Sequence, residues 1–133
     1  MMLIETYLKE SKIHGIGIFS KEDIPKGKKI WKFHKGYDRN FSQEELLQLP
    51  EPIKKDIIKY GYKNKKDQRI VYCIDNAKFF NHSSNPNTKE TSENYKESYT
   101  VTIKNIKKNE ELTCNYFELD LFAPNKIGHL NNS

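Results

Sequence analysis

The sequence is poor in cysteine, in arginine and in long apolar segments, and each shortage narrows the function. Its two cysteines, Cys73 and Cys114, are too few for a cysteine-rich zinc site or a disulfide framework, so we expect no bound metal. Arg39 and Arg69 are the only arginines, which gives little support to sequence-specific nucleic-acid recognition, because arginine is the commoner base reader. No apolar run approaches the roughly 18 residues that a membrane span needs.

Length and composition predict a single domain over residues 1–133. Hydrophobic residues make up 35% and charged residues 31%, so the core is thin, and aromatic residues at 12% supply much of its area. The net charge of +5 favours acidic partners without identifying them. Residues 1–6 lack a basic region followed by an apolar one, and the two thiols suit reducing surroundings. We therefore expect an intracellular protein, in an unspecified compartment.

Most of the chain shows the short alternating patterns of β-strands. One segment differs: Ser42 followed by Glu45 is a capping-box signature, which predicts a helix over residues 43–49, and Pro52 can begin a second helix with Ile53, Ile57 and Tyr60 on one face. The sequence therefore predicts a mostly β fold with a small helical insert at about residues 42–60. The predicted strands cover residues 2–8, 16–20, 28–34, 69–75, 88–91, 98–103 and 113–116.

Three short motifs stand apart from this scaffold. Gly15 and Gly17 are spaced by one residue, which allows close approach of a ligand to the main chain, although this pair on its own favours a simple tight turn into the strand at residues 16–20. Residues 81–87 read Asn-His-Ser-x-x-Pro-Asn, and residues 111–116 read Glu-Leu-Thr-x-x-Tyr. The second and third motifs begin about 30 residues apart, with a predicted strand pair between them.

Taken in this order, the three motifs resemble the SET domain of protein-lysine methyltransferases, over roughly residues 3–122. The resemblance implies the β-clip SET fold, in which the last motif threads under a loop to form a pseudoknot. It makes residues 36–69 the variable helical insert and residues 117–133 a short C-terminal tail. It also implies S-adenosyl-L-methionine as cofactor on one face, and a lysine of a protein or peptide substrate entering a narrow channel from the opposite face.

The activity that this resemblance implies is methyl transfer to a lysine amine, an in-line displacement at the methyl carbon of a sulfonium. A free lysine has a pKa of about 10.4, so at pH 7 only about one in 10³ is neutral and able to attack. The site must desolvate the ammonium, which lowers its pKa, and must hold nitrogen, methyl group and sulfur in line.

The resemblance assigns roles residue by residue. Tyr116 would be the catalytic tyrosine and would also contact the cofactor; the alternative is a core tyrosine that ends a strand. The amide of Asn81 both donates and accepts, which suits the amino and carboxylate end of the cofactor. His82 would face the adenine through its backbone, with a structural ring. The other expected cofactor contacts are His14, Gly15, Ile16, Gly17 and Phe122.

The expected walls of the substrate channel are Phe33, Tyr72, Cys114 and Phe117. Aromatic faces attract a methylammonium by cation–π interaction, but ordinary core packing is the alternative role for Phe33 and Tyr72. Several family members have an aromatic residue at the position of Cys114, and a smaller side chain there would permit higher methylation of the lysine.

Departures from the family pattern leave some questions open. Ser84 stands where many members have a zinc-binding cysteine, and no cysteine-rich tail follows it, so no metal is expected. The short tail must close the channel alone or with a second subunit, so a homodimer is one solution. The substrate, a histone or another protein, is not identified. One rival function is a non-catalytic SET-fold module that binds a peptide or the cofactor; it would predict loss of Tyr116 or Asn81, and both are present. The other rival is a small basic nucleic-acid-binding module, which would predict arginine and aromatic residues interleaved on one face.

Overall fold

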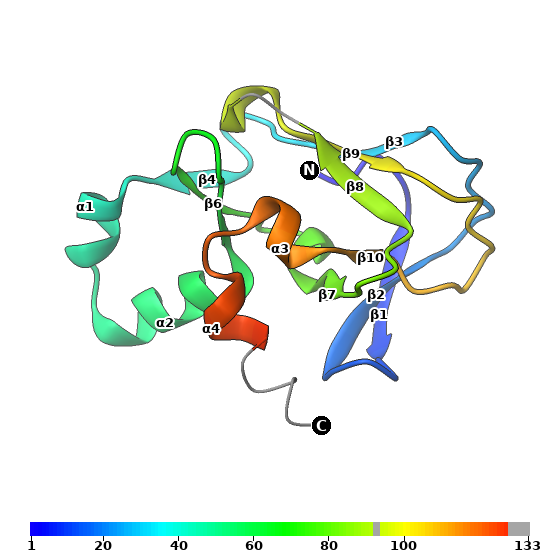
Figure 1. Ribbon diagram of the computed structural model, residues 1–133, viewed down its shortest axis with the longest axis horizontal. Helices are drawn as coiled ribbons and strands as arrows, with labels where there is room; N and C mark the ends of the chain where they lie inside the picture. The colour runs from blue at the N-terminus through cyan, green and yellow to red at the C-terminus, as the bar shows by residue number, and fades with distance from the viewer. Residues whose placement is uncertain (92–93, 128–133) are drawn as a thin grey trace.

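The computed structural model describes residues 1–91 and 94–127, and within them the chain forms four small sheets and a few short helices (Figure 1). An antiparallel hairpin pairs β1 (Thr6–Glu10) with β2 (Ile16–Ser20). The other sheets are β3 (Lys29–Lys32), β9 (Tyr99–Thr102) and β8 (Thr88–Thr91); β4 (Arg39–Phe41), β6 (Ile70–Tyr72) and β5 (Tyr62–Lys63); and the parallel pair β7 (Asn81–His82) and β10 (Thr113–Cys114).

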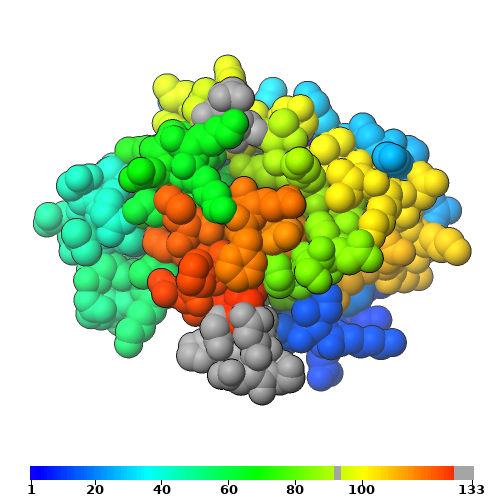
Figure 2. Space-filling view, in the orientation of Figure 1, coloured from blue at the N-terminus to red at the C-terminus, as the bar shows by residue number. Residues whose placement is uncertain are grey.

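The helices occupy two regions of the molecule. Helices α1 (Gln43–Leu47) and α2 (Glu51–Tyr60) form the insert at one end, and the β1–β2 hairpin lies in the opposite half of the molecule (Figure 1). Helices α3 (Tyr116–Leu119) and α4 (Ala123–Ile127) follow β10 and lie at the centre of the face that Figure 2 shows, in orange and red. Single 3₁₀ turns, η1 (Asn76–Phe79) and η2 (Tyr95–Glu97), complete the described elements.

The expected mostly β fold with its helical insert is confirmed, and the helix signals in the sequence worked as their chemistry predicts. The backbone N–H of Glu45 donates to the Ser42 hydroxyl at 3.1 Å, and the Glu45 carboxylate accepts from the Ser42 N–H at 3.1 Å. This exchange satisfies two backbone donors that a helix start leaves unpaired. The predicted strands 16–20 and 88–91 also form as β2 and β8.

Three local predictions were wrong. Residues 2–8 do not form one strand, because Leu3 donates instead to the carbonyl of Ile30 and β1 begins only at Thr6. In α2, Ile57 is buried but Ile53 is 48% exposed, so the predicted apolar face is narrower. The predicted strand 113–116 ends at Cys114, because the Asn115 side chain accepts from the Phe117 N–H and starts α3.

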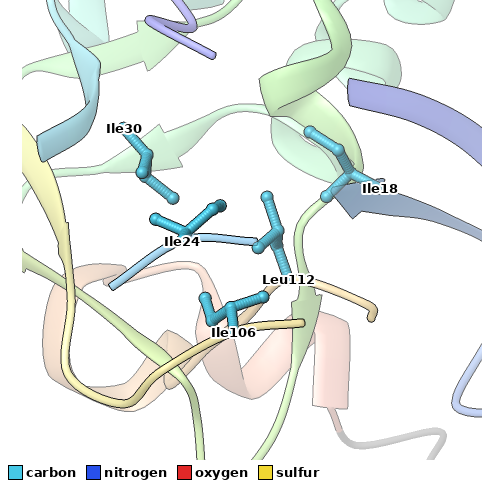
Figure 3. Close-up of a cluster of buried hydrophobic side chains, with 5 residues drawn as sticks. All are labelled: Ile18, Ile24, Ile30, Ile106 and Leu112. Atoms are coloured by element: carbon cyan, nitrogen blue, oxygen red, sulfur yellow. The ribbon is translucent and has the colours of Figure 1, made fainter. Parts of the chain in front are cut away.

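A cluster of five aliphatic residues joins the N-terminal half of the chain to the segment before β10. Their side chains point toward one another and each is at most 2% exposed (Figure 3). Burial of such side chains contributes about 1.5–3 kcal/mol each, so this cluster fixes the segment that carries the third motif. The five residues are Ile18, Ile24, Ile30, Ile106 and Leu112.

Backbone hydrogen bonds bring all three motifs side by side. The N–H of Leu112 donates to the carbonyl of Ile18 at 2.9 Å, which ties the third motif to β2 just after the first motif. Two residues later, β10 pairs in parallel with β7, so Thr113 lies opposite Asn81 and Cys114 opposite His82. The third motif therefore runs between the other two. No helix among the described residues combines the length and apolar character of a membrane span.

Candidate functional site

A large cavity lies where the three motifs meet. It has a volume of about 690 Å³ and is lined by residues 13–16 around the first motif, by residues 78–82, which lead from η1 into the second motif, and by Tyr116 of the third. Helix α2 and Lys126 of α4 complete its wall. Its volume is within the range of ligand sites in proteins. The structure thus brings His14, Gly15, Ile16, Asn81, His82 and Tyr116 together around one hollow.

Tyr116 is held at both its backbone and its hydroxyl. Its N–H donates to Nδ1 of His82 at 3.1 Å, and its hydroxyl donates to the carbonyl oxygen of Phe80. Burial raises the pKa of the Tyr116 phenol well above its ordinary value, so the group stays protonated. Because the proton is directed at Phe80, the lone pairs of the phenol oxygen point elsewhere and can accept weak contacts.

The ring of His82 has a structural role that sequence reasoning located only in part. Burial lowers the pKa of the His82 imidazole, so the neutral form is favoured. Since Nδ1 accepts from Tyr116, the neutral ring carries its proton on Nε2. The ring also lies 5.4 Å from the Tyr116 ring and contacts Phe117 edge-on. His82 therefore orients Tyr116 directly.

Asn81 ties the first motif to the third. Its side-chain nitrogen donates to the carbonyl of His14 at 3.0 Å and to Oε2 of Glu111 at 2.9 Å. The Ser11 hydroxyl also donates to Glu111, at 2.7 Å. Sequence reasoning treated Glu111 only as part of a motif, and nothing in the local pattern indicates that its carboxylate joins Ser11 to Asn81.

Gly17 serves this same cluster, and it does not line the cavity. A Cβ on Gly17 would lie 2.5 Å from Oε2 of Glu111 and 3.1 Å from Cβ of Ser11, so only glycine lets the carboxylate approach. Gly15 differs, because it lines the cavity, has a φ of +48° and has open space where a Cβ would lie. Glycine is therefore required for different reasons at the two positions. Gly15 adopts the positive φ of a turn, and Gly17 leaves room for the carboxylate of Glu111.

A smaller cavity of about 60 Å³ lies beside the first. Tyr60 and Phe80 line both cavities, so they form a common wall. Cys114 lines the smaller cavity, and burial raises the pKa of its thiol. Tyr62 and Glu90 line it as well, and neither was singled out from the sequence.

Five of the expected site residues line neither cavity, and Gly17 is one of them. Phe33 is 5% exposed and packs edge-on against Tyr95 in the core. The Tyr72 hydroxyl donates to Asp56 at 2.6 Å, which directs its side chain toward α2. Phe122 packs beside the buried cluster of Leu46, Ile57 and Ile70, and Phe117 is 42% exposed.

The carboxyl of Glu90 makes stability depend on pH. Burial raises its pKa to about 7 from an ordinary 4.5, against the opposing effect of hydrogen bonds from Ser98 and Tyr62. A carboxyl whose pKa is higher in the folded protein than in the unfolded chain stabilises the folded state. This contribution is fully present when the pH is below the unfolded pKa, and it is lost as the pH rises through the folded pKa of about 7. Between pH 5 and pH 8 we expect the free energy of unfolding to fall by about 2–3 kcal/mol relative to Glu90→Gln. Urea denaturation of both proteins at both pH values measures this, and parallel pH profiles would contradict it.

The chain is similar to one protein family and to several proteins of known structure. A family model for the SET domain matches residues 15–117. A Plasmodium falciparum protein, described as a candidate histone methyltransferase, aligns with a TM-score of 0.62 and 22% identity over 86% of this chain and 95% of that one. A Chaetomium thermophilum Polycomb Repressive Complex 2 structure, bound to S-adenosylmethionine, aligns with a TM-score of 0.67 and 19% identity over 97% of this chain.

The likeness to the Polycomb chains is one of fold. The chain spans 17% of the length of the S-adenosylmethionine-bound Polycomb chain and 15% of one bound to the inhibitor GSK126. No curated protein matches the sequence. Within residues 1–91 and 94–127, no group of three or more His, Cys, Asp and Glu side chains is arranged to hold a metal ion.

Proposed function

Since the chain belongs to the SET-domain family, we propose that it transfers methyl groups from S-adenosylmethionine to lysine side chains of a protein substrate. One observation carries the proposal: two cavities share the wall formed by Tyr60 and Phe80, and the Tyr116 hydroxyl is bonded to that wall at the Phe80 carbonyl. A cofactor on one side and a substrate amine on the other would meet at this place.

The residues of the large cavity fit S-adenosylmethionine. Phe79 and Phe80 offer aromatic surface to an adenine, and the main chain of residues 14–16 offers polar groups along one wall. Lys78, Lys59 and Lys126 also line the cavity and suit the carboxylate of the cofactor. When bound, this cofactor supplies a methyl carbon activated by an adjacent sulfonium.

The protein's own contribution is position and a dry setting. Tyr116, oriented by His82 and Phe80, presents the lone pairs of a neutral hydroxyl to the amine or to the methyl hydrogens. Burial around Tyr116 and Cys114 excludes water, which favours the neutral amine over the ammonium. No general acid–base triad is needed for this chemistry.

The direct test of the function is incubation of the protein with methyl-labelled S-adenosylmethionine and a proteome extract that includes histones. We expect label on the side-chain nitrogen of lysine, identified by mass spectrometry of the digested products. Cofactor binding without any transfer would favour the alternative of a non-catalytic binding module.

A variant of Asn81 tests the cofactor side separately. Asn81→Ala removes the donor that fixes His14 and Glu111, so the cavity wall at residues 14–16 loosens. The loss of one hydrogen bond to a charged group is worth about 1.5–3 kcal/mol, and we expect the Kd for S-adenosylmethionine to rise about tenfold or more. Calorimetric titration measures it. Asn76→Ala, which removes a bond to Thr6 outside the cavity, is the matched control, and equal affinities of the two variants would contradict the assignment.

A further inference from the structure

The smaller cavity carries one charged residue among the described residues that line it, and that residue is Glu90. The rest of the lining is apolar or aromatic, with two thiols and the hydroxyls of tyrosine and threonine. Buried carboxylates in proteins are normally paired with a cation. No lysine, arginine or histidine lines this cavity, so a cation that paired with Glu90 inside it would be supplied by a ligand.

The position of Glu90 in strand β8 directs its carboxyl into the cavity. In β8, Thr88 is buried and Glu90 is partly buried, whereas Lys89 and Thr91 between and after them are exposed, as the two-residue period of a strand requires. The Thr88 hydroxyl donates to the carbonyl of Thr113 at 2.7 Å, which fixes β8 against β10. The same face of β8 therefore directs Glu90 toward the third motif.

Two hydroxyl groups hold the Glu90 carboxyl in position. Tyr62 donates to Oε1 of Glu90 at 3.2 Å, and Ser98, which is fully buried, is also hydrogen-bonded to Glu90. Both partners are neutral, so they orient the carboxylate without neutralising its charge. The nearby acids Asp120 and Asp67 disfavour that charge further, and a positive ligand would relieve this cost.

The size and place of the cavity limit what the ligand can be. A volume of about 60 Å³ has room for only a few water-sized groups, which suits a slender alkyl chain better than a large ring system. Trp31 lines the same cavity, and its buried Nε1 has no hydrogen-bond partner among the described residues. The shared wall of Tyr60 and Phe80 places the cavity next to Tyr116.

We propose that Glu90 binds the ammonium of the substrate lysine in the smaller cavity and accepts a proton from it. In this step one N–H bond breaks and an O–H bond forms on Glu90, the nitrogen keeps the electron pair, and a neutral amine and a neutral carboxyl result. The proposal rests on the proposed methyl transfer. It supplies the neutral nucleophile that a free lysine at pH 7 offers only about once in 10³.

The proton transfer is reasonable because burial acts on both partners in the same direction. Desolvation lowers the pKa of an ammonium and raises that of a carboxyl, so the gap between them narrows in the cavity. The carboxyl already has a pKa of about 7 without the ligand, close to the pH at which a general base works best. The titratable groups that line the cavity around Glu90 are Tyr60 of α2, Tyr62 of β5, Cys73 after β6 and Cys114 of β10.

A binding experiment tests the first half of the proposal without any catalysis. Trp31 is the only tryptophan and lines the cavity, so its fluorescence reports on occupation. We expect n-butylammonium chloride to change this fluorescence saturably in the wild-type protein, with at least tenfold weaker binding to Glu90→Gln. Neutral n-butanol should not distinguish the two proteins. Equal binding of the ammonium to wild type and Glu90→Gln would overturn the proposal.

A kinetic experiment tests the second half. The experiment uses a substrate protein that the wild type methylates. Glu90→Gln should raise the KM for this substrate at least tenfold and lower kcat. In the wild type, kcat/KM should fall as the pH drops below about 7, and in the variant this fall should be absent. Glutamine keeps the shape and accepts from Tyr62, so S-adenosylmethionine affinity should stay unchanged, as should the melting temperature at pH 5, where Glu90 is neutral in the folded protein. Glu97→Gln, an exposed residue in η2, is the control.

The outcomes separate the two proposals. If the wild-type protein transfers no methyl group to any lysine, the proposed function fails, whatever the fluorescence titration shows. If the wild type is active and Glu90→Gln matches it in KM and pH profile, the role of Glu90 alone is overturned.

Discussion

Replacing Tyr116 by phenylalanine is expected to lower kcat for methyl transfer about 100-fold while the protein stays folded. The variant loses the hydroxyl that is bonded to Phe80 at the wall between the two cavities. A misplaced reacting group costs about 10²-fold in rate, because in-line displacement needs close alignment. The ring and its contact with His82 remain, so we expect the free energy of unfolding to fall by only about 1 kcal/mol.

The rate is measured with labelled cofactor under saturating substrate, and cofactor affinity by calorimetry. Tyr7→Phe is the matched control, because it removes a hydroxyl that donates to Asn109 at 3.0 Å, and neither residue lines either cavity. We expect the control to keep its activity. A Tyr116→Phe protein that methylates at the wild-type rate would show that the hydroxyl takes no part in the chemistry.

Asn87→Ala is expected to lower the free energy of unfolding by about 2–5 kcal/mol. The Asn87 side chain accepts from the Thr113 N–H at 2.9 Å and donates to the Glu111 carbonyl at 2.8 Å. Asn87 and Thr113 are 8% and 7% exposed, so alanine would leave two backbone groups unpaired out of reach of water. Each such group costs about 1–3 kcal/mol. Urea denaturation followed by circular dichroism measures the loss.

Asn85→Ala offers a control within the same turn. Its side chain is exposed and, among the described residues, accepts only from Lys104, at 2.7 Å, so we expect a change of at most about 0.5 kcal/mol. Because Asn87 holds the segment that carries Glu111 and Thr113, the Asn87 variant should also lose methyl transfer at temperatures where part of it remains folded. If both variants prove equally stable, Asn87 merely closes a turn.

The sequence was sufficient to predict which segments meet. The three motifs carry residue types and an order that resemble one family, and the structure brings residues 13–16, 78–82 and Tyr116 to one cavity. Local signals with a direct chemical cause, such as the capping box of Ser42 and Glu45, were also read correctly. The SET fold, found in both the family model and the solved structures, confirms the predicted fold class.

The sequence was insufficient where long-range pairing of side chains decides the role. Glu111 joins Ser11 and Asn81, which are 100 and 30 residues away in the chain, and Gly17 is needed only because of that approach. Glu90 looks like a polar residue in a short strand until the fold sets Tyr62 and Ser98 beside it. Conversely, the sequence cannot separate an aromatic residue that lines a channel from one that packs in the core. Phe33 was a candidate for the channel wall, and it packs against Tyr95 in the core.

A crystal structure of the protein with S-adenosylhomocysteine and a lysine peptide would test the central claim most directly. We expect the cofactor product in the large cavity, its sulfur facing the wall of Tyr60 and Phe80, and the lysine side chain in the smaller cavity on the other side, within contact of Tyr116. A lysine that enters through the large cavity, or a cofactor product bound away from Asn81 and His82, would contradict the claim.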